Sequence, residues 1–381
     1  MSRLLIFDTH PIQYRSPVFT ALSKRQADLK VLFFNETFDS RRWWFHEVGK
    51  TPPQTWGLPL QQGFPNDVLG TQGKHLFGKW KILKAALERE KPSRVAIYGY
   101  YLPEHWILRI LCGLKKIPII FIGETYFSGK LGLRRLIKTP LRSFFFRGVW
   151  RFIAIGSKSS AYYRGLGIDP ARIVPAKYCV DLTFFRQSPE VAKLTRATWR
   201  KRLGIPHDAF VVLFVGRLFE RKRPQDVLEI QKTLASAPGT YSVIVGNGPM
   251  EEPLRQVAAQ IPRLVWTGFQ NQAGTRDAYY GADVLFVPSE FETWGLVVNE
   301  AAACGLPAVL TDTCGVAGDL TVHEETGYVF PRGDVGSALH WISRLKEDRA
   351  LCRRLGNAAK SKVENEFHIG QFADAFAGLV P

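Results

Sequence analysis

Short apolar runs alternate with amphipathic stretches along the first half of the chain. Each run ends in Gly, Pro or polar residues, which is the pattern of a buried strand. The predicted strands lie at 3–9, 29–34, 94–99, 117–123 and 151–156. Helices are expected at 80–87 and 105–112, and another after Ser16 as N-cap and Pro17 as first helical residue. Strands that are apolar throughout and alternate with helices favour a parallel, doubly wound α/β sheet.

The same alternation restarts in the second half after a polar interval. Strands are predicted at 211–215, 241–245, 264–266, 283–287 and 308–310, with a helix around 224–234. We therefore expect two doubly wound domains, 1–185 and 209–365, joined by a linker at 186–208, with a C-terminal helix at 366–381 that packs back on the first domain. Two such domains leave a cleft between the carboxyl ends of their strands. The turn-rich, aromatic stretch 35–79 is interpreted as an irregular insertion near that cleft.

Composition limits where the protein is expected to work. The chain has 381 residues, 46% of them hydrophobic, and five cysteines without a C-x-x-C pair. Scattered, unpatterned cysteines favour reduced thiols and a cytoplasmic setting. The N-terminal apolar run is too short for a signal peptide, and no run of eighteen apolar residues predicts a membrane-spanning helix.

The net charge of +17 is concentrated in one half of the chain. Residues 1–185 hold 29 Lys and Arg against 12 Asp and Glu, whereas 186–381 hold 22 of each kind. The stretch 130–151 has seven basic residues, no acidic ones, and many Leu, Phe and Trp. Such a segment predicts contact with an anionic membrane surface, with a solvated basic face as the alternative. Nucleic acid is disfavoured as a partner because no motif of a nucleic-acid-binding fold is present.

Residues 289–305, S-E-F-E-T-W-G-L-V-V-N-E-A-A-A-C-G, carry the densest candidate chemistry. They follow the apolar run 284–287, and Gly305 suits a left-handed cap, so a helix is expected from about Gly295 to Cys304. Glu292 then lies in the loop before the helix and Glu300 lies inside it. Free N–H groups at a helix N-terminus favour an anion. Taken alone, the pair also fits an ordinary capped helix packed on a sheet.

Other strand ends in the second half add polar or glycine-rich groups. Gly216 and Arg217 follow the strand at 211–215, and Lys222 comes five positions after Arg217. Fixed cations at a strand end suit a diphosphate, because Arg binds its oxygens bidentately and Lys acts as a point charge. The next two strands end in further candidates, which are Gly246, Gly248 and the loop from Phe269 to Asn271. The convergence of these strand ends predicts a ligand site.

These motifs occur in a recognisable order. G-R-L-x-x-x-K, V-G-x-G, a G-F loop and P-S-x-x-E-x-x-G-L-x-x-x-E-A-x-A-x-G-x-P together closely resemble the retaining glycosyltransferases of family four, which have the GT-B fold. The resemblance covers roughly 151–381, and the first 150 residues match in architecture only. It implies two Rossmann-like domains that face each other across a cleft.

The resemblance also implies a role for each matching position. Arg217, Lys222 and Glu292 would be the catalytic residues, the two cations on the leaving diphosphate and Glu292 on the transferred sugar. Glu300 would accept from the ribose hydroxyls. The remaining donor-binding positions would be Gly216, Gly246, Gly248, Phe269, Asn271, and the backbone of Gly295, Leu296 and Val297.

The first half departs from the family pattern. The family's Gly-Gly loop is replaced by T-H-P-I-Q-Y-R-S-P, and its expected first-domain His has no clear counterpart. His10, Gln13 and Glu124 are the acceptor-side candidates, although His10 and Gln13 also fit ordinary loop polarity. No D-x-D occurs, which disfavours the metal-dependent GT-A class, so no metal and no cofactor are expected.

The predicted function is a retaining, metal-independent transfer of a hexose-type sugar from a nucleotide sugar to a lipid-linked or surface-polysaccharide acceptor. The enzyme would work in polysaccharide biosynthesis, in the cytoplasm, peripherally on the inner face of the membrane. Two alternatives remain open: a nucleotide-sugar epimerase of GT-B fold, and a non-catalytic membrane scaffold that binds a nucleotide sugar.

Overall fold

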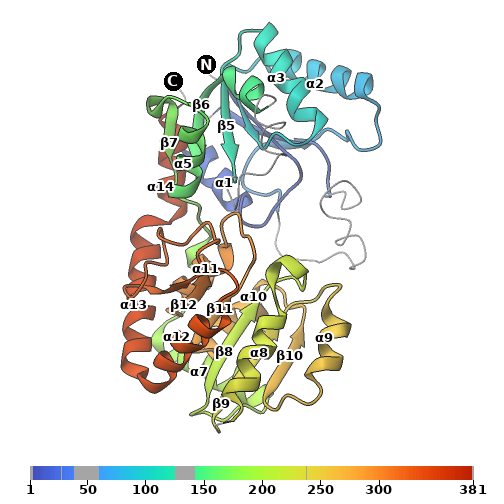
Figure 1. Cartoon of the computed structure of the whole chain (residues 1–381). Coiled ribbons are helices and arrows are strands. Elements are labelled where there is room, and N and C mark those ends of the chain that lie inside the picture. The colour runs from blue at the N-terminus through green and yellow to red at the C-terminus, as the bar shows by residue number, and fades with distance from the viewer. Residues whose placement is uncertain (1–2, 27, 38–59, 125–141, 237, 380–381) are drawn as a thin grey trace. The chain divides into compact units, whose positions relative to one another are not determined.

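The computed structural model describes residues 3–26, 28–37, 60–124, 142–236 and 238–379, which divide into two compact units (Figure 1). Unit 1 holds the described residues up to 37, from 60 to 179, and from 369 onward. Unit 2 holds those from 180 to 368. The middle of the predicted aromatic insertion, 38–59, lies outside the described part.

Unit 1 is built on a seven-stranded sheet in the order β3-β2-β1-β4-β5-β6-β7, with every strand pair parallel. The strands are β1 (Leu4–Asp8), β2 (Leu29–Phe33), β3 (Asn66–Val68), β4 (Arg94–Tyr98), β5 (Ile119–Gly123), β6 (Val149–Ala154) and β7 (Ile173–Pro175). Its helices are α1 (Ser16–Arg25), α2 (Leu76–Glu90), α3 (Pro103–Leu114), α5 (Ser157–Gly165), the 3-10 turn η2 (Pro170–Arg172) and α14 (Ile369–Ala377).

Unit 2 is built on a six-stranded sheet in the order β10-β9-β8-β11-β12-β13, again all parallel. The strands are β8 (Phe210–Val215), β9 (Thr240–Val245), β10 (Leu264–Gly268), β11 (Val284–Val287), β12 (Ala308–Thr311) and β13 (Gly327–Phe330). The helices are α6 (Leu182–Phe185), α7 (Pro189–Arg202), η3 (Glu220–Lys222), α8 (Gln225–Leu234), α9 (Glu251–Ala258), α10 (Gln272–Gly281), α11 (Leu296–Ala303), α12 (Val335–Glu347) and α13 (Arg349–Glu366).

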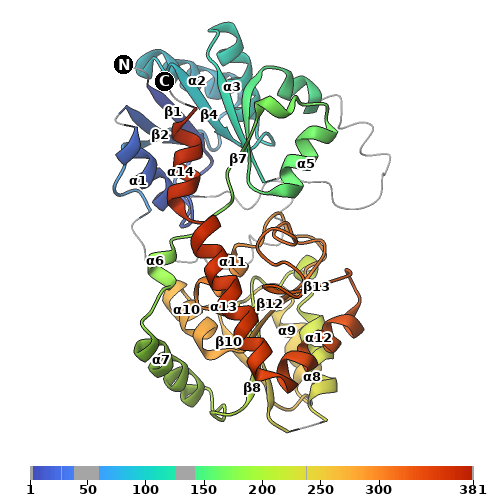
Figure 2. The same cartoon turned by 90° about the vertical axis from the view of Figure 1, so that its left-hand side faces the viewer.

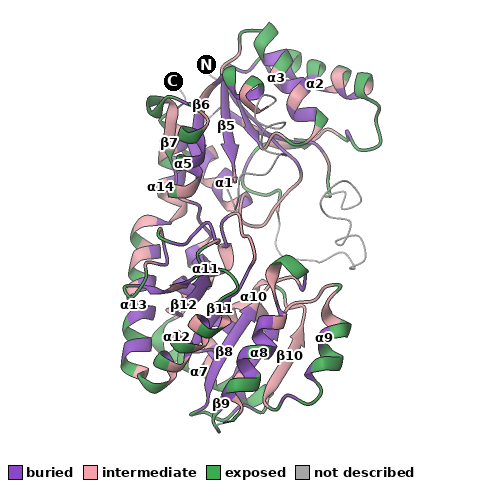
Figure 3. Cartoon of the chain, in the orientation of Figure 1, coloured by how far each residue is buried: buried purple, intermediate pink, exposed green. Residues whose placement is uncertain are grey.

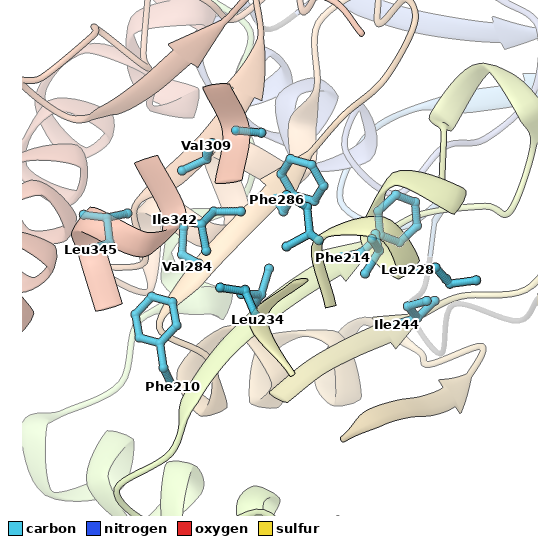
Figure 4. Close-up of a cluster of buried hydrophobic side chains, with 14 of the residues drawn as sticks. Phe210, Phe214, Leu228, Leu234, Ile244, Val284, Phe286, Val309, Ile342 and Leu345 are labelled. Atoms are coloured by element: carbon cyan, nitrogen blue, oxygen red, sulfur yellow. The ribbon is translucent and has the colours of Figure 1, made fainter. Parts of the chain in front are cut away.

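Burial follows the apolar runs that predicted the strands. The central strands β5 and β8 are drawn as buried, while α9 is mostly exposed or intermediate (Figure 3). In unit 2 the strand residues Phe214, Phe286 and Val309 pack with Leu228 and Ile342 from the covering helices (Figure 4). Burying this apolar surface is the main favourable contribution to the fold.

Residues 186–208, predicted as a linker, contain the helix α7. Its Trp199 is 3% exposed, and a Cβ added at Gly281 on α10 would collide with the indole ring. Arg200, also on α7, is 1% exposed and bonds Asp283 at 2.8 Å. Helix α7 is therefore an integral part of unit 2.

The C-terminal helix α14 packs against α1 in unit 1 (Figure 2). Phe372 and Phe376 on α14 are 1% and 0% exposed. An ion pair of 2.5 Å joins Arg25 of α1 to Asp374 of α14. The last segment of the chain thus completes the unit formed by the first.

The predicted strands are all present, with boundaries shifted by one or two residues at some ends. The prediction that Ser16 is an N-cap was wrong: Arg15 is the cap residue and Ser16 is the first residue of α1. The hydroxyl of Ser16 donates instead to the carbonyl oxygens of Ile12 at 3.0 Å and Leu60 at 2.6 Å. The helix thus begins one residue earlier than predicted, and the Ser16 hydroxyl bonds its start to Leu60.

We expect Phe376→Ala to destabilise unit 1 by about 3–5 kcal/mol, because truncating a fully buried Phe leaves a cavity. Hydrogen exchange of the amides in β1 and β2 should speed up accordingly, measured by mass spectrometry on the full chain. Phe77→Ala is the matched control, since Phe77 lies in the same unit and is 62% exposed. Equal exchange rates in the two variants would show that α14 does not stabilise this unit.

Candidate active site

Each sheet changes its winding direction at one place. In unit 2 the chain starts at β8, adds β9 and β10 on one side, and then adds β11, β12 and β13 on the other. Ligands of parallel α/β sheets bind outside the carboxyl ends of the strands at such a switch point. The switch between β8 and β11 places the loop after Val215 beside the loop after Val287.

An ion pair joins these two loops. The ammonium group of Lys222, at the end of η3, contacts the carboxylate of Glu292, and their side chains are 19% and 14% exposed. The loop that bears Glu292 is held in turn, since its carbonyl oxygen accepts from the N–H of Gly315 at 2.9 Å. An ammonium group has three N–H donors. Lys222 can therefore bond Glu292 and still donate to a bound anion.

Two arginines near Lys222, Arg217 and Arg223, have different contacts. Arg217 lies two residues after the end of β8, and its guanidinium carbon is 5.2 Å from the ring centre of Phe219. Burial lowers the pKa of Arg217 from its ordinary value, although an arginine stays charged in proteins. Arg223, by contrast, donates to both oxygens of Asp226 at 2.7 and 2.9 Å. Arg223 therefore belongs to a structural pair.

Glycines allow the loops after β8 and β9 to approach closely. A Cβ added at Gly246, whose φ is +137°, would collide with the carbonyl oxygen of Gly216. One added at Gly248 would lie 2.7 Å from the backbone nitrogen of Leu218. Gly246 and Gly248, predicted to bind the donor, are therefore also needed for the close packing of these two loops.

The loop after β10 also has a structural part. The side-chain oxygen of Asn271 accepts from the N–H of Gly274 at 3.0 Å and caps α10. Phe269, the other predicted residue of this loop, lies at the carboxyl end of β10 directly after Gly268. Both residues are at the predicted edge of the sheet.

Helix α11 begins where the sequence predicted. Gly295 is its N-cap at φ +106°, a left-handed conformation that favours glycine, and no side chain caps it. Leu296 and Val297 form its first turn, where N–H groups lack partners within the helix. Cys304 is the C-cap, and Gly305 follows at φ +77°. The predicted helix and its left-handed end are confirmed.

The second predicted carboxylate has a partner that the sequence did not reveal. Glu300 on α11 accepts a hydrogen bond of 2.6 Å from the hydroxyl of Tyr279 on α10. Protein surrounding the half-buried Glu300 raises its pKa to about 7, against the opposing effect of the Tyr279 hydrogen bond. Tyr279 itself is 1% exposed. Its sequence context is an ordinary helix, and only the packing of α10 on α11 shows its role.

In unit 1 the switch point lies between β1 and β4. Arg15 there donates to Asp8 at 2.5 Å and to Glu124, which follows β5, at 2.9 Å. The hydroxyl of Tyr178 also donates to Glu124, at 2.5 Å. Of these residues only Glu124 was a predicted site residue. Its hydrogen bonds with Arg15 and Tyr178 could not be predicted from the sequence.

The other two acceptor-side candidates lie near the same edge of the sheet. The Nδ1 of His10 is 2.9 Å from the hydroxyl of Thr9. Burial, and then the charge of Arg15, lowers the pKa of His10 to about 4, so its imidazole is neutral at pH 7. The side-chain oxygen of Gln13 is buried and has no hydrogen-bond partner among the described residues.

A cavity of about 500 Å³ lies at the opposite edge of the unit 2 sheet. Its lining includes Ala209, Asp283 and Pro307, which precede β8, β11 and β12. Asp283 is surrounded there by Arg196 at 2.7 Å, Arg200 at 2.8 Å and Arg349 at 3.2 Å. Its lining also includes Tyr279, whose hydroxyl donates to Glu300.

Comparison with known proteins matches part of the chain to a family model. Residues 195–362 match the family model described as glycosyl transferases group 1. This stretch contains Arg217, Lys222, Glu292 and Glu300. Over residues 195–362 the chain is therefore similar to the glycosyl transferases group 1.

The group 1 assignment agrees with curated relatives. The chain is 26% identical over 320 residues to the UDP-Gal:alpha-D-GlcNAc-diphosphoundecaprenol alpha-1,3-galactosyltransferase of Escherichia coli, covering 80% of this chain and 78% of that protein. It is 30% identical over 207 residues to the D-inositol 3-phosphate glycosyltransferase of Thermomonospora curvata, covering 51% and 48%. With several curated relatives the match spans less than half of their length.

Solved structures share the whole fold. Anabaena HepE in complex with UDP-glucose superposes with a TM-score of 0.75 at 17% identity, covering 100% of both chains. Sucrose-phosphate synthase from Thermosynechococcus elongatus gives a TM-score of 0.78 at 18% identity, covering 100% of this chain and 98% of the other. The prediction of two parallel-sheet α/β domains of GT-B type is confirmed.

We expect Glu300 to make the stability of the group 1 domain depend on pH. Its pKa rises from the ordinary 4.5 to about 7 on folding, so folding takes up a proton. This stabilisation is fully present below the ordinary pKa and is lost as the pH rises through the folded-state value. Between about pH 5 and about pH 8 the ionisation of Glu300 should lower the free energy of unfolding by roughly 2 kcal/mol. Glu300→Gln should remove this loss, so its melting temperature should fall less over the same pH range.

Glu325→Gln is the matched control, because Glu325 is an exposed carboxylate of the same domain. It should reproduce the wild-type pH profile. Tyr279→Phe removes the hydrogen bond that favours the ionised carboxylate, so it should move the loss of stability to higher pH. Identical profiles for wild type and Glu300→Gln would contradict the raised pKa.

Proposed function

We propose that the protein is a retaining glycosyltransferase that moves a sugar from a nucleotide diphosphate donor to a glycan or lipid-linked acceptor without a metal ion. The observation that carries the proposal is the contact of Lys222 with Glu292 at the switch point of the group 1 domain, beside Arg217. A cation and a carboxylate at one strand edge offer a diphosphate and a sugar hydroxyl complementary partners.

The two cations act on the leaving group. Negative charge accumulates on the nucleoside diphosphate as the glycosidic bond breaks. Arg217 and Lys222 are fixed near the carboxyl end of β8, so they stabilise this charge more strongly in the transition state than in the ground state. The N–H groups at the start of α11, from Gly295 to Val297, are placed to bind phosphate oxygens.

The two carboxylates hold the rest of the donor. The carboxylate of Glu292 accepts hydrogen bonds from hydroxyl groups of the transferred sugar. The contact with Lys222 fixes the orientation of this carboxylate. Glu300 accepts hydroxyls of the ribose, and Tyr279 keeps its carboxylate in place. A ligand that donates to Glu300 favours the ionised form, so donor binding releases a proton near pH 7.

The relatives support the donor and the acceptor class. The Escherichia coli relative that covers most of the chain is named for a UDP-galactose donor and a lipid diphosphate acceptor. The HepE structure contains UDP-glucose. We accordingly propose a nucleotide sugar as donor and a lipid-linked or polysaccharide precursor as acceptor.

The proposed absence of a metal ion depends on the fixed cations, which take the part that a divalent ion plays in other glycosyltransferases. Transfer should therefore proceed at an unchanged rate in excess EDTA. The epimerase alternative would invert the sugar with donor alone, and the scaffold alternative would bind nucleotide tightly without consuming it.

We expect Lys222→Ala, Arg217→Ala and Glu292→Gln each to lower the transfer rate by about 100-fold or more, the size of effect seen when one group that stabilises a transition-state charge is removed. A thermal-shift screen of nucleoside diphosphates and their sugars first identifies the donor, since binding raises the melting temperature by mass action. Transfer of labelled sugar from that donor is then measured for each variant.

Arg221→Ala is the control, because Arg221 is an exposed cation in the same loop. Its rate should stay within about 2-fold of wild type, as a solvated surface charge contributes little. Wild-type transfer rates in Lys222→Ala or Glu292→Gln would contradict the proposed active site.

We also propose that unit 1 contacts an anionic membrane surface. Of the basic segment 130–151, residues 130–141 lie outside the described part. In the remainder, Phe144 is 60% exposed and Arg147 is exposed, whereas Phe145 and Phe146 are buried. No described helix is both long and apolar enough to cross a bilayer.

We expect the protein to float with liposomes that contain anionic lipid, and to detach as salt screens the charges. Arg147→Glu and Phe144→Ser should each weaken flotation. Leu194→Ser is the matched control, since Leu194 is an exposed apolar residue of unit 2 at 66% exposure. No flotation at low salt would rule out the membrane contact.

A further inference from the structure

The acceptor side of unit 1 contains a network that the family resemblance does not supply. Glu124, one of the acceptor-side candidates, follows the end of β5. Two donors hold its carboxylate, the guanidinium of Arg15 at 2.9 Å and the hydroxyl of Tyr178 at 2.5 Å.

Arg15 is itself fixed from two sides. Its other nitrogen donates to Asp8 at 2.5 Å, and its guanidinium carbon lies 4.4 Å from the ring centre of Tyr98. Asp8 also accepts from the backbone N–H of Thr9 at 2.7 Å. A planar guanidinium held at both ends and over an aromatic ring has little freedom to reorient.

Exposure increases along this network. The side chain of Asp8 is 0% exposed, that of Arg15 is 12% and that of Glu124 is 27%. Glu124 is therefore the member that a ligand reaches first, while Asp8 and Arg15 act through it.

The charges of the network select the kind of ligand. Two carboxyl groups share one guanidinium, so the described network offers a ligand no surplus cation. His10 beside it is neutral, as shown above. A carboxylate accepts hydrogen bonds from hydroxyl groups and repels a phosphate at close range.

We propose that Glu124 binds the acceptor, that Arg15 and Asp8 are its positioning residues, and that the acceptor presents a neutral, hydroxyl-bearing sugar at this site, with any phosphate remote from the reacting hydroxyl. This inference rests on the proposed function. The proposed acceptors are neutral glycosides. Sugars or polyols that carry a phosphate next to the reacting position are excluded.

The test uses the full chain and the donor found by thermal shift. Its acceptor probes are matched pairs of octyl glycosides, each neutral sugar beside its 6-phosphate. The wild type should transfer sugar to a neutral glycoside with kcat/KM at least 10-fold above that for the phosphorylated partner. Transfer only to phosphorylated probes, or donor hydrolysis without transfer to any neutral probe, would overturn the inference.

Variants separate positioning from general structure. Glu124→Gln should raise KM for the neutral glycoside at least 10-fold and reduce the preference over the phosphorylated partner, with donor KM and donor hydrolysis unchanged. Arg15→Lys and Asp8→Asn should shift the acceptor KM in the same direction by a smaller factor. Glu88→Gln, which removes a half-exposed carboxylate of the same unit, is the charge-matched control and should change neither quantity.

The outcomes distinguish this inference from the proposed function. If no nucleotide sugar is bound or consumed by the wild type, the proposed function fails. If the donor is consumed but Glu124→Gln keeps the wild-type acceptor KM and preference, only the acceptor inference fails. A fall in melting temperature with unchanged acceptor KM in Arg15→Lys would assign Arg15 to structure alone.

Discussion

Parallel strands put all their carboxyl ends at one edge of a sheet, and this constraint positions every candidate functional group in the protein. In unit 2, Lys222 and Glu292 are 70 residues apart in sequence. They meet because β8 and β11 are neighbours at the place where the winding reverses. The same rule brings Asp8, the last residue of β1, near Glu124, which follows β5, and Arg15 bonds both. Hydrogen bonds and ion pairs then fix the final geometry within distances that the sheet has already set.

The close approach of the loops has its own requirements. Gly246 and Gly248 lie so near the loop after β8 that any side chain would collide with its backbone. This packing keeps Arg217 and the turn toward Lys222 in place before any ligand binds. Preorganised charges stabilise a transition state without reorganisation at the moment of reaction. Glycines with a purely steric role can therefore be as necessary for catalysis as the charged groups.

The sequence predicted the strands of both cores because their apolar runs are continuous. It missed β3 and β7, which are short edge strands with polar or proline residues, and β13, whose four residues were assigned to no strand. It predicted Glu292, Glu300 and the start of α11 from local signals. The roles of Tyr279 and Arg15 were not predicted, because their hydrogen-bond partners belong to other helices and strands. The assignment of Ser16 as a cap was wrong because α1 begins one residue earlier than predicted.

The two sheet edges have opposite electrostatic character. At the edge of unit 2, Lys222 contacts Glu292, Arg217 lies in the loop after β8, and Arg223 pairs with Asp226 and, at 3.8 Å, with Glu290. At the edge of unit 1, two carboxyl groups share Arg15. An edge that carries several cations suits a diphosphate, and an edge where two carboxyl groups share one cation suits hydroxyl donors. The net charge of +17 therefore does not describe the proposed acceptor site, where two carboxyl groups share one guanidinium. Local pairing, more than overall charge, decides which ligand each edge can hold.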